Sequence, residues 1–379
     1  MLNKKITILE LLTLFIAVLY AGISSKVFLG FRVVDFLLIA SFIYLFRYKI
    51  NFPIMLLLFS WFLVLFLSFT TSISYHNKFI LSDLRFFIII LFGVYSGYRI
   101  GEESNFNLES FYYKLMLITV LIYIIIPYIP SLRFYYIPQS FQKDEHKNTV
   151  FGPSLILLNY LYIYLVLVNR KRPFYFYFLY LLFAFVIFFF LNSRMQLVVM
   201  LFLVAWSFLY GIYDKIKLKH IIYALVAFII SSVLITMYNS ERIYGILHPS
   251  KDSSFVYRLI SNSLFLKKFN HSGLTTQLFG FGPGATMNLH LNDWLGTIPF
   301  FILDNGPLTI LMKLGWFGLL IYLLILYYPV RKLNLHTKFI LLFPIIISMA
   351  LTGHILYNVL YVFSLYFISF RLQKQKNIQ

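Results

Sequence analysis

Charged residues are scarce in this chain: Asp, Glu, Lys and Arg together make up only 12% of its 379 residues. Soluble globular domains carry about 25% charged residues, roughly twice that share. Hydrophobic residues account for 61% of the chain and the mean hydropathy is +0.83. The polar residues are therefore too few to cover the surface of a water-soluble fold. This composition excludes a soluble enzyme and a disordered chain.

Cysteine is absent from the sequence, which excludes disulfides, thiolate metal sites and cysteine nucleophiles. Histidines are few and scattered, and neither a His-x-x-x-His pattern nor a paired-carboxylate pattern for acid–base chemistry appears. The sequence therefore predicts neither a dedicated metal site nor a cofactor.

Long apolar runs dominate what remains, and about 20 apolar residues in a helix are enough to cross a bilayer. We predict an all-α, polytopic integral membrane protein in which residues 1–379 form a single transmembrane domain. About twelve runs have the required length, namely 6–22, 28–46, 52–71, 79–98, 110–130, 152–169, 173–191, 194–212, 219–238, 306–328, 338–353 and 354–371.

Lys and Arg alternate in density between successive loops, and loops rich in these residues stay on the cytoplasmic side. With the N-terminus inside, the basic loops near residues 47–49, 170–172, 331–338 and 371–376 are also inside. The net charge of +19 then comes mostly from the Lys and Arg residues of the cytoplasmic loops and reflects the orientation in the membrane. It does not indicate nucleic-acid binding. The one long polar segment, 239–305, is predicted to be a large extracytoplasmic loop that carries part of the active site.

Three features of this loop are candidates for chemistry. Residues 254–268 have helical spacing with Arg258 opposite an apolar stripe, so Arg258 either contacts lipid headgroups or substrate or lies on a solvated face. The stretch Leu278-Phe-Gly280-Phe-Gly282-Pro-Gly284 predicts a tight turn that either lets the backbone approach a ligand or is a plain turn. Asp304 precedes Asn305-Gly306-Pro307 and is either a helix N-cap or a general base.

Ionisable residues in or near the apolar runs are further candidates. Arg194 lies in the shortest outer loop, where it either reaches the interface or binds phosphate oxygens with its planar fork. Asp83 and Arg85 are two residues apart and do not face each other on a helix, so Arg85 is expected to point into a cavity. Lys313 is expected near a helix end or facing the interior, and His354 is either a proton relay or a structural histidine.

In their order along the chain, these motifs resemble the O-antigen polymerase and ligase superfamily of bacterial membrane glycosyltransferases (Wzy and WaaL types). The resemblance covers the layout of the whole chain. It is carried by Arg32-Val-Val-Asp35, Phe151-Gly152-Pro153-Ser154, Ser193-Arg194, Arg258, Gly280-Phe-Gly282-Pro-Gly284 and the stretch from Asp304-Asn305 to Gly315-Trp-Phe-Gly318.

The resemblance implies a GT-C-like fold in the bacterial cytoplasmic (inner) membrane, with the active site facing the periplasm or cell exterior. It implies a metal-independent polymerase of O-antigen or capsular polysaccharide, which transfers a growing glycan from undecaprenyl pyrophosphate onto a sugar hydroxyl of the next lipid-linked repeat unit. Expected partners are this lipid-linked oligosaccharide, membrane lipid and a chain-length regulator protein.

The resemblance also assigns roles to residues. Arg194 and Arg258 would hold the pyrophosphate, and Asp304 would be the base, with His290 and His271 next in order. Substrate-binding candidates are Arg85, Gly282, Gly284, His290, Asn305 and His354.

Two alternatives remain. Ligases typically carry His-Asn where this chain has Asp304-Asn305, which favours a polymerase over a ligase that transfers glycan to lipid A core or protein. A transporter that flips lipid-linked oligosaccharide would usually show repeat symmetry and broken helices at mid-membrane.

Overall fold

A computed structural model describes residues 26–28, 31–32, 50–77, 80–103, 107–125, 153–169, 171–191, 194–212, 253–292, 296–300, 303, 305–351 and 359–376. The helices are α3 (Phe52–Ser74), α4 (Ile80–Glu103), α5 (Leu108–Ile125), α7 (Pro153–Val168), α8 (Phe174–Leu191), α9 (Arg194–Ile212), α12 (Ser253–Asn270), α13 (Leu274–Phe279), α14 (Gly306–Tyr327), the 3-10 turn η4 (Tyr328–Val330), α15 (Leu335–Leu351) and α16 (Val359–Lys376). Two antiparallel hairpins pair β1 (Lys26–Phe28) with β2 (Phe31–Arg32), and β3 (Met287–Asn292) with β4 (Gly296–Phe300).

The predicted helical membrane class is confirmed. Helices α3, α4, α5, α7, α8, α9, α14, α15 and α16 form where the apolar runs predict spans. Segments Phe52–Ser74, Asp83–Glu102 and Gly306–Val330 are each long and apolar enough to cross a membrane. The count of twelve stays a prediction, because runs 6–22 and 219–238 lie outside the described residues.

The predicted span 28–46 is wrong at its start. Residues Lys26–Phe28 and Phe31–Arg32 form a hairpin rather than the first turn of a helix. Only Leu29-Gly30 separates the two strands, and a two-residue connection with glycine is typical of tight hairpins. In the motif Arg32-Val-Val-Asp35, Arg32 is in strand β2 and Asp35 lies outside the described residues.

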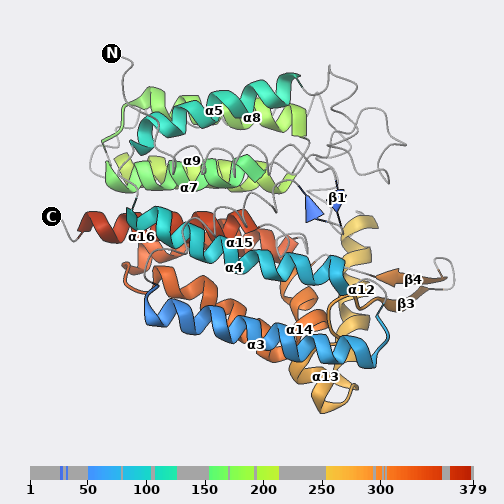
Figure 1. Cartoon of the computed structure of the whole chain (residues 1–379). Coiled ribbons are helices and arrows are strands. Elements are labelled where there is room, and N and C mark those ends of the chain that lie inside the picture. Colours follow the sequence, from blue (N-terminus) through green and yellow to red (C-terminus); the bar gives the residue numbers. More distant parts are fainter. Residues whose placement is uncertain are drawn as a thin grey trace.

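The helices are stacked in layers (Figure 1). Helices α5 and α8 form one layer, α7 and α9 the next, then α4, α15 and α16, with α3 and α14 on the other side. Helix α12 and the hairpin β3–β4 lie together at one end of the stack, and α12 contacts β3, α13 and α14. The described part of the predicted extracytoplasmic loop therefore gathers at one end of the helical body.

Helices α4 and α16 approach each other very closely. Gly93, Gly97 and Gly101 recur every fourth residue and face α16. A Cβ atom on Gly97 would lie 2.4 Å from the carbonyl oxygen of Phe363, and one on Gly101 would lie 2.7 Å from that of Phe367. Small residues at this spacing let membrane helices pack backbone to backbone, where van der Waals contact drives association.

Buried aromatic side chains add hydrogen bonds between helices. The hydroxyl of Tyr160 donates to the carbonyl oxygen of Leu341 at 2.9 Å, and that of Tyr366 donates to Ile325 at 2.9 Å. In an apolar interior such donors need a partner, and these rings supply packing area as well. The layers are thus joined by specific contacts as well as by apolar packing.

We predict that Gly97→Ala destabilises the protein by about 1–3 kcal/mol, because the new methyl group overpacks the α4–α16 contact. Thermal unfolding of the detergent-purified protein measures the loss. Gly273→Ala is the matched control, since a Cβ there meets nothing within 4 Å. Equal melting temperatures for the two variants would contradict the close contact.

Candidate functional site

The glycine loop, defined here as Gly280–Ala285, follows α13 and packs between α3 and α14. Gly280, Gly282 and Gly284 have φ angles of 75°, 86° and 79°, in the left-handed region that favours glycine. A Cβ on Gly282 would lie 2.2 Å from the Ser72 hydroxyl oxygen, and one on Gly280 would lie 2.5 Å from the Leu314 nitrogen. The close backbone approach that these two glycines permit is therefore to helices α3 and α14.

Helix α14 is interrupted where the loop meets it. Gly315 has φ 66° and ψ −166°, which no helical residue adopts. The N–H of Phe281 donates to the carbonyl oxygen of Met312 at 2.8 Å, just before the break. A Cβ on Gly315 would lie 2.4 Å from the backbone of Leu278. Irregular backbone at membrane depth is tolerated where protein buries it and supplies hydrogen bonds, and the glycine loop supplies one at this break.

Polar side chains near the end of α3 and just after it bond carbonyl groups of the glycine loop and of Phe279, the residue before the loop. Each contact comes from a serine or an asparagine, and all are 2.7–3.1 Å long. They run from Ser68 to Phe279, from Ser72 to Pro283, and from Asn77 to both Phe281 and Pro283. Because an unpaired buried carbonyl costs free energy comparable to a lost hydrogen bond, these bonds fix the path of the loop.

A buried ion pair completes the attachment. The Nζ atom of Lys313 on α14 lies 2.7 Å from Oδ2 of Asp83 on α4, and both side chains are fully buried. The same carboxylate oxygen accepts the N–H of Gly284 at 2.7 Å, and Lys313 donates to the carbonyl oxygen of Ala285 at 2.6 Å. Burying two charges is costly unless they are paired and hydrogen-bonded. Here each charge neutralises the other and also binds the loop backbone.

Arg85 adds a second buried cation to this end of α4. Its side chain is 3% exposed, and its guanidinium carbon lies 4.1 Å from the centroid of the Phe86 ring. Asp83 reaches α14, whereas the expectation that Arg85 points into a cavity stays a prediction. Lys313 faces the interior as expected, but its pairing with Asp83 was not predicted, because residues so far apart in the sequence leave no spacing signal.

The two predicted catalytic arginines are on separate elements. Arg194 is the first residue of α9, and Arg258 is within α12, while both side chains lie outside the described part of the structure. His290 is in strand β3, which packs against α12 (Figure 1), so the elements that carry Arg258 and His290 are neighbours. The side chain of His290 also lies outside the described part.

The N-cap of α14 is Asn305 and not Asp304, for which the N-cap was one of two predicted roles. The side-chain oxygen of Asn305 accepts the N–H of Leu308 at 3.1 Å and so forms the N-cap of α14. Asp304 and His354 lie outside the described residues. His271, at the end of α12, is exposed, and its Nδ1 lies 2.7 Å from the carbonyl oxygen of Lys267.

Residues 179–323 match a family model described as O-antigen ligase. This part of the chain is similar to that family. The predicted superfamily of O-antigen polymerases and ligases is thereby confirmed, and the match indicates a membrane enzyme of glycosyltransferase type. No curated protein matches the chain.

The family segment extends from within α8 to within α14, so it contains Arg194, Arg258, the glycine loop and Lys313. The residues that hold the loop from the other side, Ser68 to Asn77 and Asp83, precede the family segment. The candidate site is therefore assembled from the family segment and two earlier helices.

We predict that Asp83→Asn and Lys313→Met each destabilise the protein by about 3–5 kcal/mol, because each leaves one buried charge without its partner. The double variant should recover much of this loss, since neither charge remains. Thermal unfolding of all four proteins gives the coupling free energy. Additive losses in the double variant would contradict the ion pair.

Proposed function

We propose that this protein is a polymerase of O-antigen or capsular polysaccharide. It transfers a growing glycan from undecaprenyl pyrophosphate onto a sugar hydroxyl of the next lipid-linked repeat unit. The reaction takes place at the outer leaflet of the bacterial cytoplasmic membrane, in a GT-C-like body of about twelve spans. The observation that carries this proposal is the family match over 179–323.

The arrangement at the glycine loop supports a site at this end of the molecule. The loop, the break in α14, helix α12 and the hairpin β3–β4 all belong to or adjoin the segment predicted to be extracytoplasmic. Buried hydrogen bonds and the Asp83–Lys313 pair hold this region rigidly. Catalysis by fixed charges requires such rigidity, because a preorganised site needs no rearrangement as charge develops.

The proposed chemistry is an attack by a sugar hydroxyl on the anomeric carbon of the donor glycan. Asp304 takes the hydroxyl proton as the new carbon–oxygen bond forms. The bond from the anomeric carbon to the pyrophosphate oxygen breaks, and undecaprenyl pyrophosphate leaves with the electron pair. Arg194 and Arg258 bind its oxygens, and two guanidinium groups stabilise the charge that returns to the diphosphate. In this proposal the arginines supply the positive charge and no metal takes part.

The remaining candidates have supporting roles in the proposal. Arg85, His290 and His354 contact the lipid-linked sugars or the diphosphate. Asn305 can offer only its amide N–H groups to substrate while its oxygen caps α14. Gly282 and Gly284 act by fixing the path of the loop beside the site. Membrane lipid surrounds the enzyme, and a chain-length regulator protein is a further proposed partner.

A ligase is the second candidate, because the matching family model carries that description. In the resemblance, Asp304-Asn305 stands where ligases have His-Asn, which supports the polymerase. The two functions differ in acceptor: a polymerase extends a lipid-linked repeat unit, whereas a ligase delivers finished glycan to lipid A core or protein.

We predict that Arg194→Ala and Arg258→Ala each reduce polymer formation by at least about 10²-fold, the usual effect of removing a group that stabilises the transition state. Polysaccharide ladders on gels, normalised to membrane levels of the protein, measure the effect. Lys268→Ala is the matched control, because Lys268 is an exposed cation on the same helix as Arg258. A normal ladder in both arginine variants would contradict the pyrophosphate role.

The same polysaccharide ladders on gels test the proposed role of Asp304 as the general base. Asp304→Asn should lower polymer formation by about 10²–10⁴-fold, since the amide cannot accept the hydroxyl proton. Near-normal polymer in this variant would move the assignment to His290 or His271.

We predict that the purified protein, supplied only with lipid-linked repeat units, extends them into polymer in the presence of excess EDTA. A polymerase needs no other acceptor, whereas a ligase would leave the units unextended until lipid A core or an acceptor protein is added. Activity that disappears with EDTA and returns with a divalent cation would contradict the proposal that arginines alone supply the charge.

A further inference from the structure

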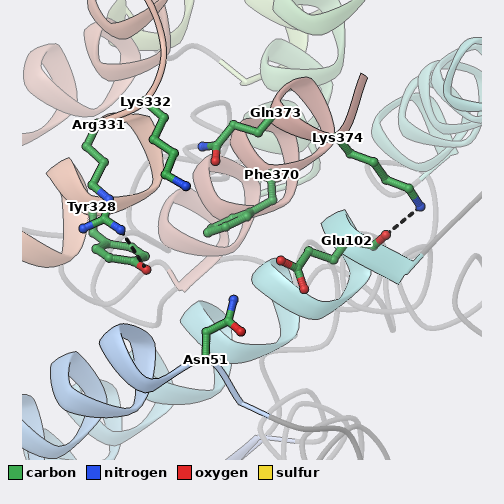
Figure 2. A pocket seen from close by; sticks show the side chains of 8 residues that line it. All are labelled: Asn51, Glu102, Tyr328, Arg331, Lys332, Phe370, Gln373 and Lys374. Carbon is green, nitrogen blue, oxygen red and sulfur yellow. Dashed lines mark hydrogen bonds between the residues drawn. The ribbon is translucent and has the colours of Figure 1, made fainter. Parts of the chain in front are cut away.

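A cavity of about 430 Å³ lies at the opposite end of the helical body from the glycine loop (Figure 2). It is bordered by Asn51 at the start of α3 and Glu102 at the end of α4, whereas Ser72 and Asp83 contact the loop at the other ends of these helices. The alternation of Lys and Arg assigns this end to the cytoplasmic side. The cavity is therefore separate from the proposed catalytic site.

Positive charge predominates in the lining. Arg331, Lys332 and Lys374 contribute three cations, and Glu102 contributes one carboxylate. That carboxylate lies 3.5 Å from the guanidinium group of Arg99, which offsets its negative charge. The cavity thus favours an anionic ligand.

Two of the three cations are held in position by neighbouring groups. The guanidinium carbon of Arg331 lies 4.1 Å from the centroid of the Tyr328 ring, and its Nη2 donates to the Tyr328 hydroxyl at 3.4 Å. The ammonium group of Lys374 donates to the carbonyl oxygen of Glu102 at 2.7 Å. An arginine stacked on a ring presents its fork at low entropic cost, and this fork matches phosphate oxygens. Figure 2 shows the end of Lys332 directed into the same space as Gln373.

The surroundings suit a lipid rather than a soluble anion. Tyr328 and Phe370 line the cavity, and aromatic rings are enriched where membrane helices meet the interface. Leu323, Leu324 and Tyr327, on the last turns of α14 just before Tyr328, are 43–50% exposed, and these side chains can lie along acyl chains. Basic pockets between membrane helices on the cytoplasmic side bind anionic headgroups.

We propose that this cavity binds the phosphate of an anionic glycerophospholipid from the inner leaflet. Arg331 binds the phosphate oxygens through its fork, Lys332 and Lys374 neutralise the remaining charge, and Gln373 contacts the headgroup. The acyl chains follow the exposed apolar side chains at the end of α14.

The test is lipid titration of the delipidated full-length protein in detergent, read out as the rise in melting temperature. Dioleoyl phosphatidylglycerol should raise the melting temperature more than dioleoyl phosphatidylcholine at equal concentration. In R331Q/K332Q, the apparent affinity for phosphatidylglycerol should fall about tenfold or more, because two cations near the headgroup are lost. The matched control is K114Q/K171Q, which removes two exposed positive charges away from the cavity and should bind like the unaltered protein.

Three results would overturn the proposal. Equal stabilisation of the unaltered protein by both lipids would exclude an anionic headgroup site. An equal loss of affinity in both double variants would show that overall charge, rather than the cavity, attracts the lipid. Displacement of phosphatidylglycerol by free inorganic phosphate or glycerol 1-phosphate at equal concentration would assign the cavity to a soluble phosphate.

Discussion

The ion pair between Asp83 and Lys313 is the contact on which the arrangement of the candidate site depends. It joins α4 to the first half of α14, and both partners also bond the backbone of the glycine loop. Two opposite charges inside a membrane protein are stable only together, because either one alone would be an unneutralised charge in an apolar medium. Because both members of the pair also bond the backbone of the glycine loop, the ion pair fixes the position of the loop between α4 and α14.

The break at Gly315 and the glycine loop both leave backbone groups that need hydrogen-bond partners, and each meets part of the other's need. A helix interrupted inside the bilayer leaves carbonyl groups without partners, and a loop buried there leaves N–H and carbonyl groups without partners. The N–H of Phe281 donates to the carbonyl oxygen of Met312. Ser68, Ser72 and Asn77 donate to the carbonyl oxygens of Phe279, Phe281 and Pro283. Irregular backbone can then persist among helices without water.

Much of the fold follows from the sequence because the bilayer imposes a length on apolar helices. The predicted start of a span at Arg194 coincides with the first residue of α9. The N-cap of α14 is Asn305, one residue later than the predicted Asp304. The attachment of Asp83 to Lys313 could not be predicted, since it depends on how distant helices pack. The glycines of the loop were recognised as permitting close approach, but the sequence does not show that the neighbour is α3. The hairpin at Lys26–Arg32 was missed because its apolar residues continue into the next apolar run.

The family segment ends within α14 and begins after α4, yet the carboxylate that neutralises its buried lysine is outside it. Residues 179–323 on their own would carry an uncompensated ammonium group into the bilayer. Chimeras between members of this family should accordingly exchange the segment together with α3 and α4, so that the residues of the Asp83–Lys313 ion pair come from the same protein.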